Sequence, residues 1–149
     1  MKQKYLFDDP HWEIDAVKDF QAFFRALLHL VPEETILCLG NGDPDKEIRS
    51  FFEHNSLSEP ELIPLAEFIG GEYLQINKEN LSKLEDLAAC HAAPEIASHL
   101  AVSDQNRQML EWYDVPFDPI TVSLEVPEEN VRNFCNELGV KYEKVEAGQ

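Results

Sequence analysis

The segment CHAAPEIASH, residues 90–99, holds the densest group of side chains that could do chemistry. It contains a thiol, a carboxylate and two imidazoles, at Cys90, Glu95, His91 and His99. Imidazoles and carboxylates bind zinc and also serve as general acids and bases. In one unbroken helix, His91, Glu95 and His99 would lie four residues apart on one face and could present three ligands to a divalent ion. They are therefore candidate catalytic or metal-binding residues.

Pro94 interrupts that geometry, because proline has no backbone N–H and ends or kinks a helix. If a helix ends near Ala92 and a strand begins near Glu95, then Glu95 and His99 share one face of that strand. His91 would then lie in the last helical turn, where the helix dipole stabilises a positive charge by about 0.3–1 kcal/mol. Two interpretations stay open: a metal or acid–base site, or a helix that runs into a strand.

A second candidate site is the segment EWYDVPFD, residues 111–118, where the acidic Glu111, Asp114 and Asp118 neighbour three aromatic rings. A carboxylate held against an aromatic wall can have its pKa raised into the range of general acid chemistry. Aromatic side chains also dominate binding energy at interfaces, whereas the two aspartates have an ordinary interpretation as turn residues. As a recognition surface, the segment provides the candidate binding residues Trp112, Tyr113, Asp114, Phe117 and Asp118.

The strongest catalytic signatures are absent from the chain. GNGDPDK, residues 40–46, lacks the spacing of a phosphate-binding P-loop, and Asp43 and Asp45 place negative charge where a phosphate would bind. There is no G-x-S-x-G, C-x-x-C or H-E-x-x-H motif. We therefore expect no cofactor, and a binding function is favoured over an enzyme.

The charge balance is strongly acidic: 29 Asp and Glu residues against 12 Lys and Arg residues give a formal net charge of −17 at pH 7. Nucleic-acid binding needs clustered basic residues that neutralise phosphates, and the basic residues here are scattered. The same field repels anionic lipid and attracts basic proteins. A basic protein is therefore the favoured partner, and nucleic acid and membrane are disfavoured; the simpler alternative is that the charge only keeps the protein soluble.

Size and cysteine usage indicate the class of protein. A chain of 149 residues that is 44% hydrophobic predicts a single globular domain over residues 1–149. Cys38, Cys90 and Cys135 form an odd, sparse set that is typical of reduced intracellular thiols. No apolar leader segment and no window of 18 uncharged apolar residues is found. We expect a cytoplasmic protein.

Hydrophobic periodicity and caps predict the elements that position these residues. Helices are predicted over 14–31, 44–55, 78–91 and 127–138, with Asp43 and Asn77 as N-caps and Gly139 as a C-cap. Strands are predicted over 35–39, 72–76, 95–102, 109–113, 120–126 and 140–145, with an irregular connection over 56–71. This order predicts an α+β fold of about four helices packed against a mixed, largely antiparallel sheet, with a small α/β domain as the competing interpretation.

The same patterns predict the core and the oligomeric state. We expect the first helix to pack over the sheet through Phe20, Phe24 and Leu27, against Leu37, Leu39, Ile120, Val122 and Leu124. Charges at Lys141, Glu143 and Lys144 should discourage strand pairing at a sheet edge, which predicts a monomer or weak dimer.

Two functional hypotheses follow from the sequence. The favoured one is a small acidic cytoplasmic domain, an adaptor or an inhibitor, that binds a basic protein through the aromatic and acidic segments DDPHW (8–12) and EWYDVPFD (111–118). The alternative is a metal-dependent hydrolase, or another small-molecule enzyme, that uses His91, Glu95 and His99.

Overall fold

Seven strands form one sheet in the part of the chain that the structure describes. The structure is a computed structural model in which residues 5–57, 71–104 and 107–146 are described. The connection predicted over 56–71 lies mostly outside these residues. The strand order is β3-β2-β4-β5-β6-β1-β7, and every neighbouring pair is antiparallel. The strands are β1 (His11–Ile14), β2 (Ile36–Gly40), β3 (Glu72–Gln75), β4 (His99–Ser103), β5 (Gln108–Trp112), β6 (Ile120–Ser123) and β7 (Tyr142–Val145).

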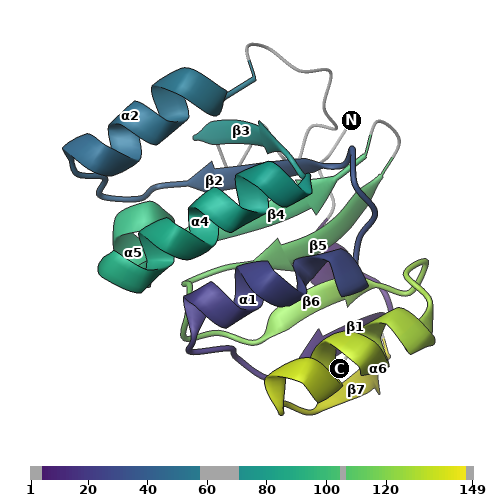
Figure 1. The fold of residues 1–149 in the computed structure, drawn as a ribbon. Coiled ribbons are helices and arrows are strands. Elements are labelled where there is room, and N and C mark those ends of the chain that lie inside the picture. Colours follow the sequence, from purple (N-terminus) through teal and green to yellow (C-terminus); the bar gives the residue numbers. More distant parts are fainter. Residues whose placement is uncertain (1–4, 58–70, 105–106, 147–149) are drawn as a thin grey trace.

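Three helices, α1, α4 and α6, cover one face of the sheet, and α1 lies between the other two (Figure 1). Together with the antiparallel sheet, this layer of helices confirms the predicted α+β class. None of the described helices is long and apolar enough to cross a bilayer. The helices are α1 (Phe20–Ala26), α2 (Lys46–Asn55), α4 (Lys78–Cys90), α5 (Ala93–Ile96) and α6 (Glu128–Leu138), with the 3-10 turns η1 (Leu6–Asp8) and η2 (Leu27–His29).

Local caps fix the ends of several helices. Asn77 accepts a hydrogen bond from the backbone N–H three residues later and starts α4, as predicted. Gly139 ends α6 in the left-handed conformation with φ 68°, also as predicted. The prediction of Asp43 as the cap of α2 is wrong, because it is the Asp45 carboxylate that accepts the Ile48 N–H at 3.0 Å.

The predicted helix over 14–31 is wrong in its first part. Ile14 belongs to β1, which pairs with β6 on one side and with β7 on the other. Asp19 accepts the Ala22 N–H, so that α1 starts only at Phe20. A strand is favoured over a helix here because the backbone of β1 forms hydrogen bonds with a neighbouring strand on each side. The spacing of apolar residues does not reveal such long-range pairing.

The predicted strand over 95–102 starts later, at His99. Before it, α5 places Pro94 in its first turn, where the missing N–H costs no intrahelical hydrogen bond. Glu95 reinforces this turn, because its Oε2 accepts the Ala92 N–H at 3.1 Å. Glu95 and His99 therefore do not share the face of one strand, and that prediction is wrong.

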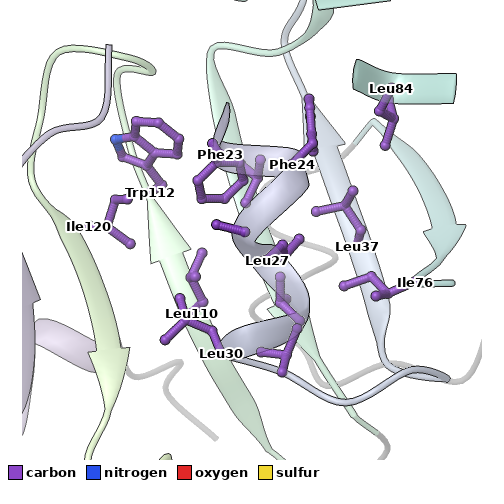
Figure 2. Close-up of a cluster of buried hydrophobic side chains, with 14 of the residues drawn as sticks. Phe23, Phe24, Leu27, Leu30, Leu37, Ile76, Leu84, Leu110, Trp112 and Ile120 are labelled. Atoms are coloured by element: carbon purple, nitrogen blue, oxygen red, sulfur yellow. The ribbon is translucent and has the colours of Figure 1, made fainter. Parts of the chain in front are cut away.

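The core lies between the helix layer and the sheet. Trp112 packs against Phe23 with ring centroids 4.8 Å apart, and Phe24 and Leu27 lie over Leu37 and its neighbours (Figure 2). All the predicted core residues except one are buried in this cluster. The exception is Leu124, which is only half-buried because β6 ends at Ser123 and a turn follows.

Strand β7 forms one edge of the sheet. Lys141, Glu143 and Lys144 are exposed there, which agrees with a role in discouraging the addition of another strand. The monomeric or weakly dimeric state stays a prediction.

Candidate functional site

A row of side chains crosses the sheet on the face opposite to the helices. Leu110 and Trp112 point toward α1 (Figure 2), so the alternation of a strand directs Glu111 to the other face. Matched register positions place the following residues side by side from β3 to β1: Tyr73, Cys38, Ala101, Glu111, Thr121 and Glu13. Glu111 is the carboxylate at the centre of this row.

Glu111 is completely buried, with 0% of its surface exposed. Both of its carboxylate oxygens lie 3.1 Å from the backbone N–H of Leu6, and the hydroxyl of Tyr113 donates to Oε1 at 3.2 Å. The pKa of this carboxyl is raised to about 7: burial is the main cause, the charge of Asp8 adds to it, and the two hydrogen bonds oppose the shift. Within the described residues, no basic side chain forms an ion pair with Glu111.

Tyr113, which bonds this carboxylate, is the centre of a cluster of four rings. Tyr5 and Phe7 stack with centroids 5.0 Å apart, and both make edge contacts with Tyr113, at 6.1 and 6.2 Å. His99 meets the same tyrosine ring at 5.6 Å. Burial and then the charge of Glu111 raise the pKa of Tyr113 far above its usual range, so its hydroxyl stays a hydrogen-bond donor.

The turn after β5 presents an exposed ring between two carboxylates. Phe117 is 67% exposed, and its N–H bonds the carbonyl of Asp114 at 2.7 Å. Asp114 and Asp118 are both exposed. Trp112 does not share this exposure, because it is fully buried and its indole Nε1 donates to the carbonyl of Asp118 at 2.7 Å. The expectation that Trp112 offers a contact surface is therefore wrong: the indole holds the turn from inside the core.

These contacts join two parts of the chain that are about a hundred residues apart in sequence. We call the result the aromatic–acidic surface and define it by Tyr5, Phe7, Asp8, Tyr113, Asp114, Phe117 and Asp118. The sequence singled out its second half, from Tyr113 to Asp118, and one member of the first half, Asp8. It missed Tyr5 and Phe7, which follow no periodic pattern; their proximity to Tyr113 could only come from tertiary structure.

His91 is engaged between two helices. Its Nδ1 donates to the carbonyl of Leu87 at 2.8 Å, and its Nε2 donates to Asp45 Oδ2 at 2.7 Å. Glu47 lies 3.5 Å from the same Nε2. The hydrogen bond to Leu87 and then that to Asp45 raise the pKa of His91, because both ring nitrogens face acceptors and the imidazolium can donate to each. His91 thus links the end of α4 to the start of α2.

The other two members of the first candidate cluster have separate partners. Glu95 caps α5, and His99 Nδ1 accepts the backbone N–H of Asp114 at 3.3 Å. Over residues 5–57, 71–104 and 107–146, no group of three or more His, Cys, Asp and Glu side chains is arranged to hold a metal ion. His91, Glu95 and His99 therefore contact separate partners and do not form a shared set of metal ligands.

A separate cavity of about 560 Å³ opens between α2 and the end of β2. Leu39, Phe52 and Ile96 contribute apolar surface to it, and Arg49 and Glu53 contribute charge. None of its lining residues belongs to the aromatic–acidic surface.

Comparison of the chain with protein-family models, curated proteins and solved structures gives no match. The function must therefore be argued from the chemistry of these sites.

Proposed function

We propose that this protein is a cytoplasmic binding domain, an adaptor or an inhibitor, whose aromatic–acidic surface binds a basic protein. The observation that carries this proposal is the packing of residues 5–8 against Glu111 and Tyr113. It brings Tyr5 and Phe7 against the second of the two predicted segments, whereas only Asp8 of DDPHW joins the surface because His11 and Trp12 lie in β1. Phe7 stays 48% exposed and Phe117 67% exposed. Exposed rings beside carboxylates suit a partner with basic and apolar groups.

Charge supports the same proposal. The formal net charge of −17 produces a field that accelerates the approach of a basic protein. The exposed carboxylates are also neighbours in sequence of the exposed rings: Asp8 follows Phe7, and Asp114 and Asp118 flank Phe117. The exposed rings, once covered by the partner, would provide most of the binding energy. The carboxylates would determine how fast the complex forms and how strongly its formation depends on salt.

The cysteines support the cytoplasmic part of the proposal. Cys90 and Cys135 are free thiols, and Cys90 is exposed. An exposed free thiol persists in a reducing compartment, where disulfides are rarely formed.

The test is affinity capture at low ionic strength, followed by binding measurements with the purified captured protein. Phe117→Ala should weaken binding at least about tenfold, as expected for the loss of an exposed aromatic anchor. The double variant Asp114→Asn, Asp118→Asn should slow association and reduce its salt dependence.

The matched control is Asp86→Asn with Glu129→Gln, which removes the same charge from α4 and α6. The proposal predicts that this control retains nearly all the affinity of the wild type, apart from a small long-range effect of charge. Equal losses in the control and in the Asp114 and Asp118 variant would show that only overall charge matters. A partner that binds Phe117→Ala as tightly as the wild type would contradict the proposed surface.

A further inference from the structure

Glu111 is a buried carboxylate with no basic partner among the described residues. Its oxygens accept hydrogen bonds from a backbone N–H and a phenol, which are both neutral donors. A buried carboxylate that is not paired with a positive charge is costly when ionised, which is why its pKa stands near 7. A positive group delivered to this position would remove that cost.

The cover over Glu111 is thin. Turn η1 contains no buried residue, and Phe7 is 48% exposed. The two backbone hydrogen bonds of the turn, from Asp8 to Tyr5 and from Asp9 to Leu6, are internal to the segment. The Leu6 N–H ties the turn to the sheet through its contact with the Glu111 carboxylate. Lifting residues 5–8 would break the ring contacts of Tyr5 and Phe7 with Tyr113 but would leave the pairing of the seven strands intact, because η1 is not part of the sheet.

The surroundings of Glu111 match a guanidinium group. A guanidinium is planar, stacks on aromatic faces and donates two parallel hydrogen bonds to one carboxylate. The Tyr113 ring stands beside the carboxylate, and the rings of Tyr5 and Phe7 already pack against it. We propose that an arginine side chain of the basic partner displaces the Leu6 N–H and binds Glu111 against the ring of Tyr113. This inference rests on the proposed function, because it names the group that the same surface recognises.

The proposal links binding to pH. The charged and titratable groups that face Glu111 are Asp8 on η1 and Tyr113 directly after β5, while Tyr5 and His99 face the Tyr113 ring. An arginine would bind the ionised form of Glu111, so binding would release a proton. The affinity for arginine should then rise about tenfold per pH unit below about pH 7 and level off above it.

The experiment is an NMR titration of isotope-labelled protein with N-acetyl-arginine amide, and with N-acetyl-citrulline amide as the uncharged probe of similar shape. Arginine should shift the signals of the Leu6 amide and the Tyr113 ring and lower the pKa of Glu111 by about one unit or more at saturation. Citrulline should do neither. Glu111→Gln should weaken arginine binding at least about tenfold and remove its pH dependence below pH 7.

The matched control is Glu13→Gln, a half-buried carboxylate of the same row, which should retain arginine binding. Shifts confined to exposed carboxylates such as Asp114, or an unchanged pKa of Glu111, would overturn the proposal. The pKa is measured on the wild-type protein, so this result does not depend on whether Glu111→Gln folds.

The two proposals can fail separately. Salt-sensitive capture of a basic partner whose affinity is unaltered by Glu111→Gln would refute the arginine site and leave the proposed function standing. The opposite result is also possible: arginine binds at Glu111, but the affinity for the captured partner changes neither with Phe117→Ala nor with salt. That result would refute the proposed function instead.

Discussion

Replacing Glu111 by glutamine should change how the stability of the protein depends on pH. The pKa of Glu111 rises from 4.5 to about 7 on folding, because the carboxyl is buried. Between these values the folded state holds a proton that the unfolded state has lost, so stability falls as pH rises through this window and levels off above about pH 7. The difference of about 2.5 pH units, at about 1.4 kcal/mol per unit, gives an upper limit of about 3.5 kcal/mol.

The assay is urea denaturation of the wild type and Glu111→Gln at about pH 5 and about pH 8, which span most of this titration. Glutamine keeps an acceptor for the Leu6 N–H but cannot ionise. The loss of stability between the two pH values should therefore be up to about 3 kcal/mol smaller in the variant, and the comparison cancels the repulsion among the other acidic groups. An identical pH dependence in both proteins would refute the burial of an uncompensated carboxyl at this position.

Three further predictions concern the core and the first candidate cluster. Phe24→Ala should cost about 3–5 kcal/mol in chemical denaturation, because Phe24 is fully buried; a change below about 1 kcal/mol would contradict the core assignment. His91→Gln should reduce stability more at about pH 5 than at about pH 8, because the raised pKa of His91 gives stability that is complete below about pH 6.5 and is lost as pH rises through the folded-state pKa; a larger loss at the higher pH would contradict the two donated hydrogen bonds. The purified protein should hold no stoichiometric zinc, measured by elemental analysis, because His91 and the other candidates of residues 90–99 have separate partners; bound zinc that is lost on His99→Ala would contradict this.

Elements defined by local chemistry could be predicted from the sequence. The Asn77 cap and the apolar spacing after it correctly predicted α4. Acidic residues in the first turn and Gly139 after the last turn correctly predicted α6. The errors arose where distant contacts decide the outcome. Ile14 matches a helical stripe, yet it lies in a strand that pairs with residues more than a hundred positions away. Pro94 is compatible both with the end of one helix and with the start of another, and the sequence pattern alone does not choose.

The candidate site was predictable only in part. The turn over 113–118 could be predicted from its aspartates, prolines and aromatic rings. The covering of Glu111 by residues 5–8 could not, because it depends on a contact between residues 105 positions apart in sequence. The burial of Trp112 does have a local signal, because Leu110 and Trp112 must share a face of their strand. That alternation places Trp112 in the core with Leu110 and directs Glu111 to the opposite side.

The most direct test of the proposed function is backbone hydrogen exchange of this protein with and without its captured basic partner. We predict slower exchange in the complex at the amides of residues 113–118, with no change over α1, α4 and α6, because none of these helices contributes a residue to the aromatic–acidic surface. Protection of the helix layer with unchanged exchange over 113–118 would show that the partner binds elsewhere, and it would contradict binding through the aromatic–acidic surface.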